Sequence, residues 1–279
     1  MAQQVRQQGL DKFYTKPEVA KQCIEDVWKI REDWGLVVEP SAGNGSFYNR
    51  IPATSKIGLD ISPEATDIIE QDFFTFIPVT NQDILVIGNP PFGKNSSLAI
   101  RFFNHASQWA EMIAFIVPRT FRKISLQNRL DLNFHLIHER ELSTKPCCFE
   151  PPMMVKCCFQ IWQRNAIPRR ILVQPTTHPD WIFLPYGPKD GRGQPTPPQG
   201  AEFALRAYGG RCGEICETHL QDLRPKSWHW IKACIDKNLL INRFQQLDYS
   251  SGTHTARQNS IGRAELVSLY VSLLDSKRQ

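Results

Sequence analysis

Short apolar runs, separated by turn residues and helical patterns, recur through the first half of this sequence and constrain its fold more than any other feature. The runs cover residues 36–38, 56–59, 84–87 and 112–117. Runs of this kind are typical of strands buried on both faces of a parallel sheet. Apolar residues at helical spacing predict helices over 17–30, with Thr15 and Glu18 in a capping-box pattern, and over 96–110. Because strands and helices alternate, we expect a doubly wound α/β sheet.

Two longer strands are predicted next, over 133–142 and 154–163, joined by a connection rich in proline and cysteine. They indicate a hairpin at one edge of the sheet, completing a domain of residues 1–165. Residues 166–279 differ in character, and we expect a smaller, basic α+β region there. Its predicted parts are a proline- and glycine-rich loop over 185–200, a strand over 202–208, and helices over 228–244 and 262–274.

The composition is that of a folded protein. Of 279 residues, 41% are hydrophobic and 22% are charged, which is far too apolar for a disordered chain. No stretch approaches the roughly 18–20 apolar residues of a membrane span, and the first residues lack the apolar block of a secretory signal. We therefore expect an intracellular protein, cytoplasmic or associated with the nucleoid or nucleus, with no membrane contact. Nothing in the sequence specifies an oligomeric state.

The cysteines favour neither disulfides nor a metal. The eight cysteines include two adjacent pairs, whose members would point to opposite faces of a strand, so we expect reduced thiols. Cys212, Cys216 and His219 could form half of a metal site, but no second half follows at a matching spacing. We therefore expect no metal.

Charge is unevenly distributed along the chain. Residues 1–150 carry 16 Lys and Arg against 18 Asp and Glu, whereas residues 151–279 carry 17 against 10. A basic region is typical of a polyanion-binding surface, although a solvated basic face has the same surplus. The candidate phosphate contacts are Arg169, Arg170, Lys189, Arg192, Arg206, Arg211, Arg224 and Lys226.

Acidic residues follow successive predicted strands. Glu39 ends the first strand, and the turn after it, Ser41-Ala42-Gly43-Asn44-Gly45, leads toward a helix and lets a ligand approach the backbone. Asp60 comes 17 positions after the first turn glycine, where a carboxylate can accept hydrogen bonds from ribose hydroxyls. Asp72 can accept from an adenine amino group, with Phe73 against the ring. Each acid alone would be read as a surface or capping carboxylate; the series predicts a site for a positively charged nucleoside.

The strand over 83–88 runs into Asn89-Pro90-Pro91-Phe92. An exocyclic amine conjugated to a ring is a poor nucleophile because its lone pair is delocalised, and two acceptors aimed at its N–H bonds favour the localised form. The Asn89 side-chain carbonyl and the Pro90 backbone carbonyl can supply these acceptors, while the prolines hold the loop rigid. Phe92 offers a face on which a planar base can stack.

In this order, the motifs resemble those of the S-adenosylmethionine-dependent amino-methyltransferases, most closely the gamma-class DNA adenine-N6 methyltransferases. Phe13-Tyr14-Thr15-Lys16-Pro17 is similar to the leading cofactor motif of that family, although Lys16 separates the usual Thr-Pro pair and Phe92 replaces the commoner Tyr. The resemblance covers about residues 10–165. It implies a Rossmann-like class I methyltransferase sheet and S-adenosylmethionine as the cofactor.

The resemblance also implies residue roles. The implied catalytic residues are Asn89, Pro90, Pro91 and Phe92. The implied cofactor-binding residues are Tyr14, Thr15, Glu39, Ser41, Ala42, Gly43, Asn44, Gly45, Asp60, Ile61, Asp72, Phe73 and Asn89. Phe149 matches the aromatic residue of a late motif and would support an extruded base together with Phe92, unless it packs in the core of the hairpin turn.

The substrate implied is the N6 amine of adenine in DNA. The same loop also serves enzymes that methylate adenine in RNA and the amide of glutamine in proteins, so an RNA adenine-N6 methyltransferase is the first alternative. A non-catalytic nucleic-acid-binding module of the same fold is the second.

Overall fold

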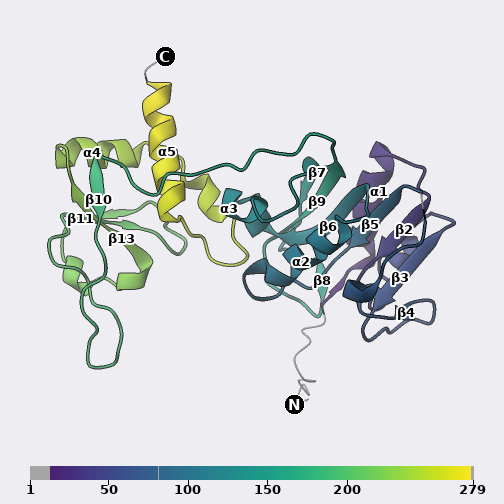
Figure 1. The fold of residues 1–279 in the computed structure, drawn as a ribbon. Helices are drawn as coiled ribbons and strands as arrows, with labels where there is room; N and C mark the ends of the chain where they lie inside the picture. The colour runs from purple at the N-terminus through teal and green to yellow at the C-terminus, as the bar shows by residue number, and fades with distance from the viewer. Residues whose placement is uncertain (1–12, 81, 278–279) are drawn as a thin grey trace, which may run out of the picture. The chain divides into compact units, whose positions relative to one another are not determined.

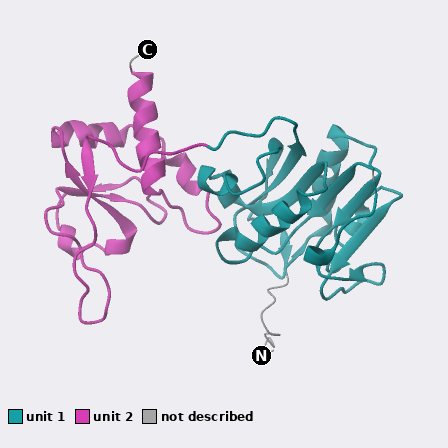
Figure 2. Ribbon diagram, viewed as in Figure 1, with its two compact units in different colours: residues 1–171 teal, residues 172–279 magenta. Residues whose placement is uncertain are grey.

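The computed structural model describes residues 13–80 and 82–277. The chain divides into two compact units, residues 1–171 and residues 172–279 (Figure 2). Within the described ranges, no helix combines the length and the apolar character needed to cross a membrane.

A seven-stranded sheet forms the first unit (Figure 1). Its strands are β2 (Leu36–Glu39), β3 (Lys56–Asp60), β4 (Ile69–Glu70), β5 (Ile84–Gly88), β6 (Met112–Pro118), β7 (Phe134–Glu141) and β9 (Cys157–Arg164). Their order across the sheet is β4-β3-β2-β5-β6-β9-β7, in which the first five are parallel and β9 is antiparallel to both of its neighbours. The predicted Rossmann-like α/β sheet with an edge hairpin is confirmed.

The strand order reverses between β2 and β5. From β2 the chain builds outward to β3 and β4, and then returns to place β5 on the other side of β2. In open α/β sheets, ligands bind beyond the carboxyl ends of the strands at such a reversal. Glu39 ends β2 and Asn89 follows β5, so the topology brings the two predicted motifs to the same edge.

Helices cover the sheet because their apolar stripes match its buried strands. The helices are α1 (Pro17–Ile30), α2 (Ser97–Ala106) and the short α3 (Ile124–Gln127). Phe103 of α2 meets the rings of Phe134 and Trp162 at centroid distances of 5.6 Å. Along β2 and β5, Val37 and Leu85 point to the face of the sheet opposite to α2. They are as buried as the neighbouring residues that pack in the cluster with α2, so both faces of the sheet are covered. The prediction for 17–30 is confirmed, and the helix predicted over 96–110 ends at Ala106.

A small two-stranded sheet joins the start of the first unit to the hairpin connection. It pairs β1 (Tyr14–Thr15) with β8 (Phe149–Glu150) in antiparallel register, so that Thr15 lies opposite Phe149. The leading motif and the late motif, more than 130 residues apart in sequence, are therefore hydrogen-bonded neighbours.

The second unit is an α+β structure, as predicted. Its strands are β10 (Trp181–Phe183), β11 (Phe203–Arg206), β12 (Ile215–Cys216) and β13 (Trp228–Ala233), in the antiparallel order β10-β13-β11-β12. Its helices are α4 (Lys237–Gln245) and α5 (Arg263–Ser276). Short 3-10 turns across the chain are η1 (Tyr48–Arg50), η2 (Phe73–Thr75), η3 (Lys94–Ser96), η4 (Arg119–Arg122), η5 (Leu220–Asp222), η6 (Pro225–Ser227) and η7 (Tyr249–Thr253).

The predicted helix over 228–244 is wrong in its first half, which forms β13. Trp228 and Trp230 enter one apolar cluster and Ile231 enters another, so adjacent side chains point to opposite faces, as they do in a strand. The helix begins only after Asp236, whose carboxylate accepts from the Leu239 backbone N–H at 2.8 Å.

Two local predictions near the start of the chain are also wrong. Lys16, and not Thr15, occupies the position before α1, and no side chain caps that helix, because Thr15 is held in β1. The turn after Glu39 leads only to η1, because few residues separate the turn from β3.

Candidate active site

The loops that follow β2 and β5 touch each other. The Ser41 hydroxyl donates to the Asn89 backbone carbonyl at 3.1 Å. A Cβ atom on Gly88 would lie only 3.2 Å from Cγ of Glu39, so glycine allows the end of β5 to approach this carboxylate. The predicted cofactor turn, residues 41–45, therefore contacts the loop of residues 89–96, which begins at Asn89 and is called the acceptor loop below.

The glycine turn draws in residues from two other segments. The Gly43 backbone N–H donates to Asp60 Oδ2 at 2.8 Å, and its φ of +49° favours glycine. A Cβ there would lie 2.7 Å from the ring of Tyr14. The Tyr14 hydroxyl donates to Glu64, and burial together with this carboxylate raises the pKa of Tyr14. Tyr14, Gly43 and Asp60 thus gather as the sequence predicts.

Glu39 is the most unusual group of the site. It is 2% exposed. One of its oxygens accepts from the Tyr48 backbone N–H, while Oε2 has no hydrogen-bond partner within residues 13–80 and 82–277. Burial raises the pKa of this carboxyl well above its usual range. Because an unpaired buried carboxylate is costly, the position suits a positively charged ligand group.

Two further buried oxygens at this edge also lack a partner among the described residues, namely Asn89 Oδ1 and Thr15 Oγ1. The Asn89 amide nitrogen donates to the Phe13 carbonyl at 3.4 Å, which orients its side chain. Together with Glu39 Oε2, the three unpaired acceptors come from three segments of the chain. Each of them can accept a hydrogen bond from an N–H or O–H group of a ligand.

The acceptor loop is held at its far end by backbone geometry and by β6. The Phe92 carbonyl accepts from the Leu98 N–H at 3.1 Å. Gly93 and Ser96 both have positive φ angles, +68° and +61°. The buried Ser96 hydroxyl shares a hydrogen bond of 2.8 Å with Thr120, directly after β6. A strained but well-bonded loop of this kind keeps its acceptors preorganised.

Two aromatic residues lie elsewhere than expected. Phe73 is 1% exposed and stacks on Phe102 at 5.1 Å, so it belongs to the core and does not face an adenine ring. Phe149 is 2% exposed, because alternation along β8 turns it inward and Glu150 outward. These positions correct both expectations. Phe92, which is only partly buried, remains the aromatic candidate for stacking.

The remaining predicted residues lie around the same edge. Asp72 is exposed and its Oδ1 accepts from the Phe74 N–H at 2.9 Å, which caps η2. Asn44 is exposed and Ile61 is 52% exposed. Ala42, Gly45 and Pro90 are buried, whereas Pro91 is exposed.

Several predicted phosphate contacts are occupied within the protein. Arg169 donates to the backbone carbonyls of Phe134 at 2.6 Å, Gln127 at 3.1 Å and Asp131 at 3.3 Å, and is not free to bind phosphate. Arg206 and Arg211 each pair with Glu214 at 3.0 Å, and Lys226 donates to Gln194. Arg211 and Lys226 remain exposed despite these contacts, and the other exposed candidates are Arg170, Lys189, Arg192 and Arg224.

The charge surplus also belongs partly to the first unit. Residues 172–279 hold 13 Lys and Arg against 10 Asp and Glu, so their balance is only +3. The other four basic residues of the predicted basic half lie in 151–171, which contains no acid.

Charges divide across the carboxyl edge of the first unit. Residues 61–72, after β3, contain four acids and no basic residue. The loops after β5, β6 and β7, residues 89–96, 119–133 and 142–156, contain seven basic residues against two acids. The basic ones are Lys94, Arg119, Arg122, Lys123, Arg129, Lys145 and Lys156. Arg119 and Arg122 pair with Glu141 and Glu139 of β7, so part of this basic surplus is neutralised within the unit. A cationic ligand is favoured beside residues 61–72, and the remaining basic residues favour an anionic one beside the loops after β5, β6 and β7.

Other candidate sites lack comparable chemistry. A shallow hollow lined by Arg31, Trp34, Gly35 and Gln82 lies at the amino-terminal ends of β2 and β5, on the edge opposite to Asn89. In the part of the chain that the structure describes, no group of three or more His, Cys, Asp or Glu side chains could hold a metal ion.

Sequence reasoning missed Glu64, Ser96 and Thr120. Glu64 and Thr120 bond to residues at least 24 positions away, and no local pattern signals such contacts. The position of Ser96 directly before an amphipathic helix suggests only a cap.

No protein-family model and no curated protein matches this chain. Solved structures do show similarity. A candidate RNA methyltransferase from Pyrococcus horikoshii is 18% identical over 56% of this chain and 89% of its own, with a TM-score of 0.43. The 23S rRNA methyltransferase ErmE is 15% identical over 56% and 71%, with a TM-score of 0.43. The modification subunit of a candidate type I restriction enzyme from Vibrio vulnificus is 14% identical over 95% and 61%, with a TM-score of 0.41. The fold assignment rests on the strand order described above.

Proposed function

We propose that this protein is an S-adenosylmethionine-dependent methyltransferase that acts on the exocyclic N6 amine of adenine in nucleic acid, with DNA as the preferred substrate. The observation that carries the proposal is the pair of unpaired buried acceptors, Glu39 Oε2 and Asn89 Oδ1, at the switch point between β2 and β5. One suits a cationic cofactor, and the other suits the N–H of an amine.

The residues around the glycine turn fit the proposed cofactor. S-adenosylmethionine carries an ammonium group, a sulfonium, ribose hydroxyls and an adenine amine, and when bound it supplies an electrophilic methyl group. Glu39 is the buried partner for the positive charge. Asp60, already oriented by the N–H groups of Gly43 and Ser62, keeps acceptor capacity for ribose hydroxyls. Asp72 is exposed beside η2 and can accept from the adenine amine.

Asn89 and Pro90 act on the substrate amine. Their two carbonyl oxygens accept its N–H bonds, localise its lone pair and aim it at the methyl group, and Phe92 offers a face for the ring. Since Ser41 and the Ser96–Thr120 hydrogen bond already restrain this loop, little reorganisation is needed in the transition state. In a duplex, the base must first be extruded at a cost of a few kcal/mol. The proton released from the methylated amine passes to solvent.

The basic residues in the loops after β5, β6 and β7 support a nucleic-acid substrate, because a protein amide or a small amine needs no such surface. The preference for DNA rests on the resemblance of the motif order that begins at Phe13. Adenine in RNA is the alternative outcome of the experiment below.

The test is methyl transfer from labelled cofactor to matched duplex DNA, single-stranded DNA and RNA, with mass spectrometry of the modified nucleoside. We expect N6-methyladenine in DNA. Asn89→Ala should keep cofactor affinity, measured by calorimetry, but lower single-turnover rates at least about a hundredfold, because an acceptor that acts in the transition state is lost. Near-normal turnover in this variant would refute the mechanism. A chain that binds no S-adenosylmethionine would instead be the non-catalytic module.

A further inference from the structure

Lys94 stands at the end of the acceptor loop, five residues after Asn89. It begins η3, and its side chain is exposed. The backbone here has a defined conformation, since Gly93 has a φ of +68° and Ser96 bonds to Thr120 at 2.8 Å. The position of this lysine relative to Asn89 is therefore fixed by the same contacts that hold the acceptor loop.

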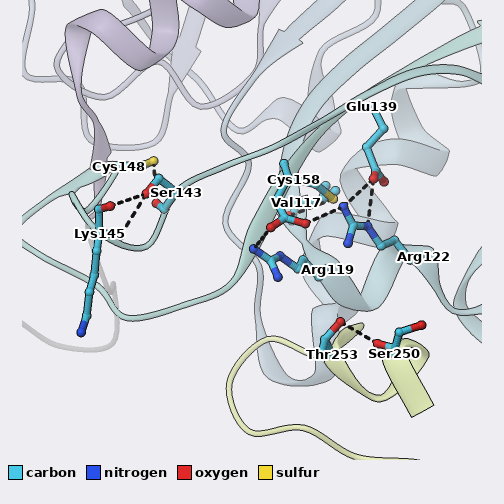
Figure 3. A network of polar contacts seen from close by, with 11 residues as sticks. Val117, Arg119, Arg122, Glu139, Ser143, Lys145, Cys148, Cys158, Ser250 and Thr253 are labelled. Atoms are coloured by element: carbon cyan, nitrogen blue, oxygen red, sulfur yellow. Dashed lines mark hydrogen bonds and ion pairs between the residues drawn. The ribbon is translucent and has the colours of Figure 1, made fainter. Parts of the chain in front are cut away.

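Lys145 lies in the connection between β7 and β8, and it is also exposed. The Ser143 hydroxyl bonds twice to the backbone of Lys145: it donates to the Lys145 carbonyl at 2.7 Å and accepts from the Lys145 N–H at 3.1 Å. Figure 3 shows the Lys145 side chain extending away from Ser143 and Cys148. A backbone held by these two bonds thus carries an exposed ammonium group.

A continuous set of contacts links this second lysine to Asn89. The Asn89 amide donates to the Phe13 carbonyl at 3.4 Å. Two residues later, Thr15 pairs with Phe149, and the Lys16 N–H donates to the Cys148 carbonyl at 2.9 Å. The turn that carries Lys145 therefore adjoins the segment that orients Asn89.

Neither lysine has an acidic partner within residues 13–80 and 82–277, in contrast to the arginines nearby. Arg119 pairs with Glu141 at 2.6 Å and Arg122 with Glu139 at 2.7 Å, and Figure 3 shows Arg122 and Glu139 together. Those ion pairs use the charges of the arginines internally. The two lysines keep theirs for an external anion.

We propose that Lys94 and Lys145 are a pair of phosphate contacts that hold the nucleic-acid backbone beside the base presented to Asn89. The inference rests on the proposed function and identifies the first unit itself as a backbone-binding surface. Each phosphate contact should contribute about 0.9 to the slope of log affinity against log salt on duplex DNA, and about 0.7 on a single strand. Loss of both should weaken duplex binding roughly thirtyfold at 0.15 M salt.

The test compares two double variants of the full chain that remove the same charge. Lys94→Gln with Lys145→Gln removes the proposed pair. Lys29→Gln with Arg31→Gln removes two charges at the end of α1, next to the opposite edge of the sheet. Binding of labelled duplex DNA, single-stranded DNA and RNA of one sequence is titrated between 50 and 300 mM salt, roughly the range in which phosphate contacts are resolved. Calorimetry with S-adenosylmethionine checks that each variant keeps its cofactor site.

We expect the Lys94 and Lys145 double variant to lose about 1.8 from the duplex slope, or about 1.4 on a single strand. Its KM for nucleic acid should rise, while kcat at saturation and cofactor affinity stay unchanged. The control pair should keep the slope of the unmodified protein. Equal slopes in the two double variants would overturn the inference and leave the proposed function standing. An unmodified protein that binds the cofactor but none of the three nucleic acids would overturn the proposed substrate and the pair together.

Discussion

Arg169→Ala should destabilise the first unit without changing how the protein binds nucleic acid. The Arg169 guanidinium donates to three backbone carbonyls in the 127–134 segment and lies over the ring of Trp162 at 5.3 Å. Hydrogen bonds from a charged group contribute about 1.5–3 kcal/mol each, and a cation–π contact contributes about 0.5–1 kcal/mol. Two of the carbonyls share one nitrogen, so two such bonds are counted.

Ordering the arginine side chain costs about 2 kcal/mol, and water can reach part of the freed backbone. The expected loss is therefore about 2–4 kcal/mol in the free energy of unfolding. Native-state hydrogen exchange of β9 amides measures this for the first unit alone, which a single denaturation curve of a two-unit chain would not. Arg170→Ala is the matched control, because Arg170 is exposed and its removal should stay within about 0.5 kcal/mol.

Arg169→Lys provides a further check, since an ammonium keeps the charge but cannot reach the same carbonyls as a planar fork. The free energy of unfolding of the lysine variant should lie between that of the alanine variant and that of the unmodified protein. The reasoning would be refuted if Arg169→Ala were as stable as Arg170→Ala and also lowered the salt slope of nucleic-acid binding, because Arg169 would then be a phosphate contact.

Three other substitutions address the proposed cofactor site. Burial raises the pKa of the Glu39 carboxyl, so folding favours its protonated form. The protonated carboxyl therefore contributes fully to the free energy of unfolding below its unfolded pKa of about 4.3. This contribution is lost as pH rises through the folded pKa. At pH 7–8, Glu39→Gln should therefore have a larger free energy of unfolding than the unmodified cofactor-free protein, and this difference should vanish near about pH 4. The variant should also lose affinity for S-adenosylmethionine. Urea titrations over this pH range and calorimetry measure the two effects, and a stability difference that does not depend on pH would contradict the account. Asp60→Ala should weaken cofactor binding by about 1–3 kcal/mol, through lost charge-assisted hydrogen bonds, and Asp72→Ala by less, since it would meet one neutral amine. If calorimetry shows both aspartate variants binding as tightly as the unmodified protein, the cofactor does not occupy this turn.

Local patterns predicted the first unit well. The runs at 36–38, 56–59, 84–87 and 112–117 all form strands of the sheet, because a strand buried on both faces needs a continuous apolar run. They failed at β13, because the sequence predicts a helix over 228–244, whereas residues 228–233 form a strand. Side-chain periodicity in so short a segment is ambiguous until the partner strands are known.

The sequence by itself determined which residues follow which strand, and hence that Glu39, Asp60 and Asn89 stand at one edge once the strands are parallel. Only the tertiary structure decided which of the predicted residues are available to a ligand. Phe73, Phe149 and Arg169 are of residue types suited to a site. However, the two phenylalanines are buried in the protein, and Arg169 donates to backbone carbonyls. Residue type and spacing specify what a side chain can do, whereas its availability depends on contacts between segments far apart in the chain, which no local pattern encodes.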